Sequence, residues 1–266
     1  MGVINVTPDS FSDGGRFVNH EAAVAQALRM VEEGAGLIDV GGESTRPGAL
    51  GVSAEEEIGR VVPVIEALAA RTEVPISVDT SKPAVMTAAV RAGASMINDV
   101  RALREPGAIE AAARTDATIC LMHMQGEPRT MQADPRYGDV VAEVRDFLRD
   151  RAQACLTAGI AGDRLVVDPG IGFGKRLEHN LALLAGLPAL TGLGWPVLIG
   201  VSRKSMFGTL LGRAVDERVA GGVAMATAAV LAGASIVRTH DVAATIDAVK
   251  VAVALREAGM TVGCRL

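Results

Sequence analysis

Polar residues that could bind or transform a small molecule recur along the chain, each after a short run of apolar residues. They are Asn5, Asp39, Asp79, Asn98 with Asp99, His123, Asp168, Ser202, and Arg238 with His240. Carboxylates and amides supply oxygen acceptors, whereas arginine presents a planar fork of donors that suits a carboxylate or a phosphate. One polar residue at the end of an apolar run is common, but a nearly complete series predicts one shared binding pocket.

Three members of this series favour an amino-heterocycle as ligand. Asp79, Asn98 and Asp168 offer acceptor oxygens from three separate apolar runs, and Asn98 can also donate through its amide. Converging acceptors would recognise the donor-rich edge of such a ring, because each unmatched buried polar group is penalised. Carboxylates at these positions could equally hold a metal ion or cap the next helix, and both alternatives stay open.

Two long polar segments follow the first two apolar runs. Residues 7–15 combine hydroxyl groups, two carboxylates and the ring of Phe11 with a final glycine pair, a composition typical of a lid over a ligand. Residues 41–48 place Arg46 between a hydroxyl and Pro47, which suits a carboxylate or phosphate. The alternatives are an aromatic turn packed on the protein and a solvated arginine.

Residues 168–175 contain spaced glycines that end in Lys175. A Walker phosphate loop needs Gly at position 169 and Ser or Thr at position 176, whereas this chain has Pro169 and Arg176. No acidic residue follows a second strand at the distance that a dinucleotide fold requires. We therefore interpret the segment as a loop that brings its backbone and Phe173 close to a ligand.

The last two polar segments are residues 202–205 and 238–241, and their basic residues predict an anion-binding site. The chain has only four lysines against twenty-two arginines, and Lys82, Lys175 and Lys204 all follow apolar runs, where a compact charge would matter. Arg238 with His240 predicts a diphosphate site; a histidine satisfied within the core is the alternative.

Eight continuous apolar runs indicate strands buried on both faces, as in parallel sheets. They cover residues 3–6, 37–40, 76–79, 96–99, 118–123, 165–168, 197–202 and 235–239. Helical patterns lie between them, for example over residues 21–33, 54–70, 84–92, 140–158 and 217–232, and four of the expected helices end at Gly34, Gly93, Gly159 and Gly233. Eight such units predict a (β/α)₈ TIM barrel in a single domain over residues 1–266, with a doubly wound open sheet as alternative. In the barrel, the carboxyl ends of the strands converge on one mouth.

The composition and charge of the chain argue against some classes of binding partner. The chain has 266 residues, a net charge of −5 and 49% apolar residues, and it lacks runs of basic residues, so we expect neither nucleic acid nor a membrane as partner. Three widely separated cysteines exclude a disulfide framework, and no signal peptide is recognisable, so we expect a cytoplasmic protein. Residues 219–237 are uncharged but rich in glycine and alanine, and we expect a buried helix followed by a strand.

Several linked motifs, taken in order, carry a specific resemblance. They are residues 5–15, 39–48, 77–80, 97–100, 121–124, 168–175, 202–205 and 238–242. With these motifs the sequence resembles the dihydropteroate synthase family from Met1 to the last predicted strand. Thr239 stands where that family more often has an apolar residue, and we expect no effect on function.

The resemblance implies a transferase that joins 6-hydroxymethyl-7,8-dihydropterin diphosphate to 4-aminobenzoate, giving 7,8-dihydropteroate and diphosphate in folate biosynthesis. It also implies Mg²⁺ as cofactor and a homodimer. The implied pterin-binding residues are Asp79, Asn98, Asp168, Lys204 and Arg238. The implied diphosphate-binding residues are Asn5, Arg238 and His240, with Asn5 also on the metal. The implied aminobenzoate-binding residues are Phe11, Thr45, Arg46, Pro47, Phe173, Lys204 and Ser205.

The chemistry of this reaction predicts departure of diphosphate before attack, because an aniline-type nitrogen is a poor nucleophile. Phe11 and Asp13 would supply π and negative density beside the pterin cation when their loop closes with the Arg46 loop. The implied catalytic residues are Phe11, Asp13, Lys204 and Arg238.

Two other functions remain open from the sequence. A pterin-binding methyltransferase that serves a corrinoid protein would share the barrel but not the first two loop motifs. A catalytically silent pterin sensor would not need Asn5, Arg46 and Lys204 intact.

Overall fold

Strands and helices alternate along the computed structural model, which describes residues 1–7, 16–44, 51–127 and 129–260. The strands are β1 (Gly2–Asn5), β2 (Ile38–Gly41), β3 (Ile76–Asp79), β4 (Met96–Asp99), β5 (Thr118–Met122), β6 (Leu165–Asp168), β7 (Leu198–Gly200) and β8 (Ile236–Arg238). The helices are α1 (Arg16–Glu32), α2 (Ala54–Ala69), α3 (Pro83–Arg91), α4 (Ala108–Ala113), α5 (Val140–Thr157), α6 (Leu177–Ala185), α7 (Leu187–Thr191), α8 (Met206–Leu211), α9 (Val219–Leu231) and α10 (Val242–Glu257). Two short 3₁₀ helices cover Gly162–Arg164 and Val215–Glu217.

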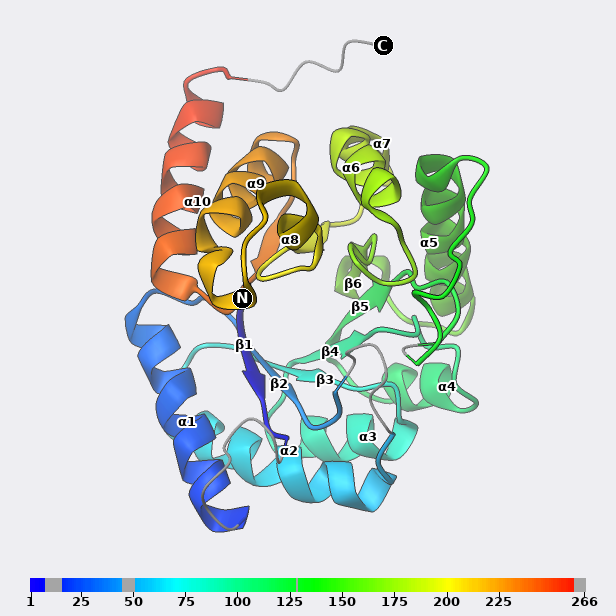
Figure 1. Ribbon diagram of the computed structural model, residues 1–266. Coiled ribbons are helices and arrows are strands. Elements are labelled where there is room, and N and C mark those ends of the chain that lie inside the picture. The colour runs from blue at the N-terminus through cyan, green and yellow to red at the C-terminus, as the bar shows by residue number, and fades with distance from the viewer. Residues whose placement is uncertain (8–15, 45–50, 128, 261–266) are drawn as a thin grey trace.

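All the strand pairs are parallel, and they follow chain order. Strands β1 to β6 form one sheet, and β7 pairs with β8 in a second. Single parallel bridges join the two sheets at both seams, from Val167 to Val197 and from Gly2 to Thr239. The eight strands therefore form a ring with helices around it (Figure 1), and the predicted (β/α)₈ barrel is confirmed.

The local sequence explains where helices begin and end. The Ser53 hydroxyl accepts a hydrogen bond of 3.1 Å from the Glu56 N–H at the start of α2, and acidic residues in that first turn match the helix dipole. After α3, Gly93 has a φ of +116°, and a Cβ at this position would lie 2.8 Å from the Ala69 Cβ. Only glycine fits such a turn without strain, which explains why it precedes β4.

Side chains inside the barrel form layers. Met96, Cys120, Val166 and Leu198 pack together from four neighbouring strands, with Leu37 and Ile236 against them. Side chains alternate between the two faces of a strand, so residues two positions later return to the same inner face. This places Asp39, Asn98, Asp168 and Arg238 in the next inward-facing layer, directly above the apolar one. The apolar floor and the polar mouth are consecutive layers of one barrel.

Two local predictions need correction. Residues 197–202 and 235–239 were expected to be strands, but β7 and β8 hold only three residues each because the chain turns at the barrel mouth directly after them. The helix expected over residues 217–232 is α9, but it is not the buried helix expected within residues 219–237. It buries only Ala226, Ala229 and Val230, because its other side lies at the surface. Among the described residues, no helix is long and apolar enough to cross a membrane.

Candidate active site

Arg238 is the centre of a charged cluster at the barrel mouth. Its Nε donates to Asp39 Oδ2 at 2.7 Å, and its Nη2 donates to Asp79 Oδ2 at 2.9 Å. The Asn98 amide donates to the same Asp39 oxygen at 3.0 Å. Residues separated by up to 199 positions thus meet at one guanidinium. The barrel positions them, because β2, β3, β4 and β8 all end at this mouth.

Burial and charge compete in this cluster. Burial opposes the charge of Arg238, but Asp39 and Asp79 outweigh it and raise the guanidinium pKa above its ordinary value. Burial raises the pKa of Asp79 to about 7, and Arg238 offsets only part of that effect. Asp79 can therefore change protonation near neutral pH when a ligand alters its hydrogen bonds.

One register row joins four neighbouring strands at this mouth. Asn5 pairs with Gly41, Gly41 with Asp79, and Asp79 with Asn98. A Cβ on Gly41 would lie 3.5 Å from the Asp79 Cβ and 3.7 Å from Asn5 Oδ1. Asn5 and Asp79 therefore lie close together on either side of the buried Gly41.

Lys204 lies on the opposite side of the mouth, after β7. Its Nζ donates to the Ile171 carbonyl at 2.6 Å and lies 4.3 Å from the centre of the Phe173 ring. Burial lowers the pKa of Lys204 to about 8, although Asp168 acts in the opposite direction. This lysine is thus held by a backbone oxygen and an aromatic face, with its charge directed at the site.

Asp168 completes the set of acceptors predicted for a heterocycle. Its Oδ1 accepts a hydrogen bond of 2.7 Å from the Gly170 N–H. Burial raises the Asp168 pKa, while that hydrogen bond, Lys204 and Arg238 oppose the rise. The structure therefore brings Asp79, Asn98 and Asp168 to one mouth together with Arg238 and Lys204.

His240 and Ser202 lie beside Arg238 in the turns after β8 and β7. The His240 N–H donates to Ser202 Oγ at 3.1 Å, and Ser202 Oγ lies 3.1 Å from His240 Nδ1. Burial, with Arg238 and Arg203 nearby, lowers the pKa of His240 to about 4, so the ring is neutral at pH 7. When the Ser202 hydroxyl donates to Nδ1, Nε2 carries the ring hydrogen and can donate to an anion.

The turns after β7 and β8 are tied together by an ion pair. Arg203 Nε and Nη2 donate to Asp241 at 3.2 and 2.5 Å, and Arg203 has a φ of +58°. A left-handed conformation is costly for a residue with a Cβ, so the ion pair and the hydrogen bond from Arg218 to the Arg203 carbonyl hold a strained turn. That turn directs Ser202 toward His240 and Lys204 toward Ile171.

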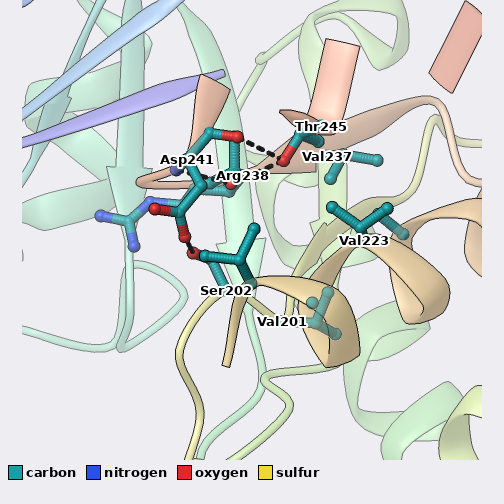
Figure 2. Close-up of a pocket in the computed structure, with 11 residues that line it drawn as sticks. Val201, Ser202, Val223, Val237, Arg238, Asp241 and Thr245 are labelled. Carbon is teal, nitrogen blue, oxygen red and sulfur yellow. Dashed lines mark hydrogen bonds between the residues drawn. The ribbon is translucent and has the colours of Figure 1, made fainter. Parts of the chain in front are cut away.

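Figure 2 shows the cavity behind this turn, between α9 and the β7–β8 pair. Val201, Val223 and Val237 line it together with Ser202 and Asp241. The Arg238 guanidinium points away from the valines. Arg238 thus lines this cavity, while its guanidinium is directed to Asp39 and Asp79 at the barrel mouth.

Asn5 is the residue that the sequence places on a metal. Among the described residues, no group of three or more His, Cys, Asp or Glu could hold a metal ion. The Asn5 side chain is half-buried, and its amide oxygen nevertheless fits Mg²⁺, which commonly takes one or two protein oxygens together with phosphate oxygens and water. The donor set therefore suits an ion that arrives with a diphosphate.

Comparison with known proteins decides the family. Residues 1–240 match the family described as pterin binding enzyme. Dihydropteroate synthase from Escherichia coli strain K12 is 54% identical over 251 residues, covering 94% of this chain and 89% of the relative. The chain belongs to the dihydropteroate synthase family.

Solved structures of the family share the fold. The Yersinia pestis dihydropteroate synthase with a sulfonamide drug complex has a TM-score of 0.92 and 53% identity, and the match covers 97% of this chain and 94% of that chain. The Xanthomonas albilineans dihydropteroate synthase with 4-aminobenzoic acid has a TM-score of 0.91 and 56% identity, over 96% and 92% of the two chains. Such relatives favour the synthase over the methyltransferase alternative.

Not every residue predicted from the family resemblance can be placed. Phe11, Asp13, Thr45, Arg46 and Pro47 lie outside the described residues. Ser205 is exposed and immediately precedes α8, next to Lys204.

Sequence reasoning assigned no role to two groups in the site. Asp39 was noted only as the end of an apolar run, yet it accepts from both Arg238 and Asn98. Lys175 and His123 were recognised as polar loop residues, but their buried contact, with 2.9 Å between Lys175 Nζ and His123 Nδ1, was not expected. The only available signal for Asp39 was its place in the same series as Asp79 and Asp168.

Proposed function

We propose that this protein condenses 6-hydroxymethyl-7,8-dihydropterin diphosphate with 4-aminobenzoate to give 7,8-dihydropteroate and diphosphate. The observation that carries the proposal is the cluster of Asp39, Asp79, Asn98 and Arg238 at one barrel mouth. Membership of the dihydropteroate synthase family supports it, and a relative of similar fold binds 4-aminobenzoic acid.

Asp79, Asn98, Asp168 and Lys204 are proposed to hold the pterin. The two carboxylates can accept from the amino and ring N–H groups of the heterocycle, and the Asn98 amide can donate as well as accept. Arg238 Nη1 donates no hydrogen bond to any described residue, and 22% of the Arg238 side chain is exposed. Arg238 therefore retains a donor for the diphosphate and a planar face for the pterin ring.

Asn5, Arg238 and His240 are proposed to bind the diphosphate. Arg238 supplies charge, and neutral His240 supplies an Nε2–H donor that Ser202 orients. Asn5 Oδ1 is the proposed protein ligand of Mg²⁺, which when bound would neutralise charge on the leaving diphosphate.

Phe173, Lys204 and Ser205 are proposed to form the described part of the aminobenzoate site. The Phe173 ring and the Lys204 ammonium already lie against each other, so an aromatic ring and a carboxylate would find matching groups there. Phe11, Thr45, Arg46 and Pro47 are proposed to complete this site from the two loops of the family motifs.

We further propose that diphosphate departs before the amine attacks, with Phe11 and Asp13 as catalytic residues beside Lys204 and Arg238. The carbon–oxygen bond to the diphosphate breaks, the amine nitrogen then bonds to the methylene carbon, and its proton passes to solvent or diphosphate. Aminobenzoate should therefore bind tightly only when pterin and diphosphate with Mg²⁺ are present. Calorimetric titration with and without Mg²⁺-diphosphate measures this, and equally tight binding to the empty protein would contradict the order.

The reaction itself is tested by diphosphate release. We expect release only when the protein, Mg²⁺, the dihydropterin diphosphate and 4-aminobenzoate are all present. Release at the same rate without 4-aminobenzoate would indicate hydrolysis and would contradict the proposed condensation.

We also propose a cytoplasmic homodimer. The surface formed by α8 and the following 3₁₀ helix supports the dimer, because Leu210, Leu211 and Val215 are 44, 51 and 54% exposed. Light scattering after size exclusion measures the mass, and Leu211→Glu should shift a dimer toward monomer. A monomeric wild-type protein would contradict the assembly but not the reaction.

A further inference from the structure

Lys175 is the most deeply buried lysine in the described part of the chain, with 3% of its surface exposed. Its Nζ lies 3.0 Å from the Gly170 carbonyl, 2.9 Å from the Phe173 carbonyl and 2.9 Å from His123 Nδ1. A fourth acceptor, the His123 carbonyl, lies at 3.4 Å. The loop over residues 169–175 thus closes around the ammonium group at its own end.

This ammonium has no ion-pair partner within the described residues. Its neighbours in charge are Asp168 and Lys204, which act on it in opposite directions. Burial, with Lys175 and Arg104 nearby, lowers the pKa of His123 to about 2, so the imidazole is neutral and Nδ1 can accept a hydrogen bond. A buried cation solvated by carbonyl groups rather than a carboxylate fixes the positions of those carbonyls.

The loop is packed too closely to adopt another path. A Cβ on Gly170 would lie 1.9 Å from the His123 carbonyl oxygen, and one on Gly174 would lie 2.3 Å from the Gln125 carbonyl oxygen. Tyr137 Oη also donates to the Gly174 carbonyl at 2.8 Å. The backbone between Asp168 and Lys175 therefore rests directly on the segment after β5.

The same loop holds Lys204. The Ile171 carbonyl, which accepts from Lys204 Nζ, lies between the Gly170 and Phe173 carbonyls that accept from Lys175. The Phe173 ring covers the Lys204 ammonium, and a Cβ on Gly172 would lie 3.0 Å from Lys204 Cδ. Lys175 thus donates to the loop from its buried side. Lys204 contacts the Ile171 carbonyl and the Phe173 ring of the same loop.

We infer that Lys175 is a positioning residue, whose buried ammonium holds the Ile171 carbonyl and the Phe173 ring in the geometry that places Lys204 in the site. The contacts of Lys175 Nζ are with His123 and with the Gly170 and Phe173 carbonyls. The consequence for catalysis rests on the proposed function, whereas the consequence for Lys204 does not.

Lysine-selective NMR tests the inference without any substrate. The chain has only four lysines, so protein labelled with ¹³C-lysine gives few signals to assign. In the wild type, the ring current of Phe173 should shift the Lys204 Hε signals upfield. Lys175→Met, which keeps the length of the side chain but removes the charge, should return them toward the position of exposed Lys250. Phe173→Leu serves as the reference for complete loss of the ring current.

A matched control separates positioning from loss of stability. Leu68→Ala removes a fully buried side chain from α2 and should lower the melting temperature without moving the Lys204 signals. In kinetic assays, Lys175→Met should lower kcat/KM for aminobenzoate by roughly 10- to 100-fold, whereas Leu68→Ala and Lys250→Met should not.

The outcomes distinguish the two proposals. If no protein in the series releases diphosphate, the proposed function fails and the NMR comparison still decides the role of Lys175. An unchanged Lys204 signal in folded Lys175→Met would overturn the inference. If that variant does not fold, Lys175→Gln, which keeps a donor for the carbonyls, should show a smaller change of the same kind. Failure of both variants to fold would also overturn it, because Lys175 would then serve the whole fold.

Discussion

The carboxylates of Asp39 and Asp79 both accept hydrogen bonds from the Arg238 guanidinium. Substitution of either carboxylate therefore changes the charge balance around Arg238. Asp39 accepts from both Arg238 and Asn98, whereas Asp79 has one hydrogen bond from Arg238. Asp79 is consequently the carboxylate better able to turn toward a ligand, and Asp39 is the one that anchors the arginine.

Asp79→Asn should weaken pterin binding more than aminobenzoate binding. The new amide presents a donor to the donor-rich edge of the heterocycle, and loss of a hydrogen bond to a charged group costs about 1.5–3 kcal/mol. Titration calorimetry with each ligand measures the difference. Asp146→Asn on the exposed face of α5 is the control, and equal losses for both ligands would indicate a general disturbance instead.

Lys175 should make stability depend on pH in a defined window. Burial lowers its pKa in the folded protein to about 7 from an ordinary value of 10.5, so between these values the unfolded chain binds more protons. The free energy of unfolding should therefore rise with pH through this window, by up to about 1.4 kcal/mol per pH unit. Urea denaturation of the wild type and Lys175→Met at pH 7 to 10 measures the difference. A difference that stays constant with pH would contradict a Lys175 whose pKa is lowered by burial.

At the scale of elements, the turns that follow β7 and β8 act as a pair. The Arg203–Asp241 ion pair joins them, and Ser202 lies 3.4 Å from Asp241 Oδ2 while it contacts His240. The neutral donor of the proposed anion site, His240, therefore depends on one strained turn.

Asp241→Asn should weaken diphosphate binding although Asp241 is not proposed to touch diphosphate. Loss of the charge loosens the Arg203 turn, and we expect a cost of about 0.5–1.5 kcal/mol in diphosphate affinity. Competition with a pterin that lacks the diphosphate provides the comparison, because its affinity should fall less. Equal effects on both ligands would show that the turn supports the whole mouth.

A second cluster supports the segment after β2. Lys82, at the start of α3, donates to Glu43 and, at 2.5 Å, to Glu57. The Glu57 side chain is only 1% exposed, and its Oε1 has no hydrogen-bond partner among the described residues. Lys82→Met would leave Glu57 as a buried unpaired carboxylate, so we expect a loss of about 3–5 kcal/mol in the free energy of unfolding. Chemical denaturation measures it beside exposed Lys250→Met, which should change little, and similar stabilities for the two variants would contradict the role given to Lys82.

At the scale of the whole molecule, the barrel could be predicted because its strands are short, apolar and buried on both sides. The bounds predicted for residues 76–79, 96–99 and 165–168 are those observed, since each run begins after a turn and ends on a polar residue. The three-residue strands β7 and β8 were overestimated, because apolar residues continue into turns whose path depends on Arg203 and on the bridge at Thr239.

The sequence predicted which residues share the site, but not which side chains pair with one another. Polar strand ends had to share a mouth once the barrel was assumed, whereas the pairing of Arg238 with Asp39 depends on side chains that face each other across the barrel. The burial of Lys175 was equally hidden, since a lysine after three glycines resembles a phosphate-binding loop in sequence. Such pairings arise from tertiary packing, which no local pattern encodes.

The central claim is that this barrel mouth joins the two substrates, and measuring the product tests it most directly. Wild-type protein should convert the dihydropterin diphosphate and 4-aminobenzoate, with Mg²⁺, into 7,8-dihydropteroate and diphosphate in equal amounts, as quantified by chromatography with mass detection. Lys204→Met should retain its melting behaviour and lose most of this product. Diphosphate without dihydropteroate, or full product from Lys204→Met, would contradict the account.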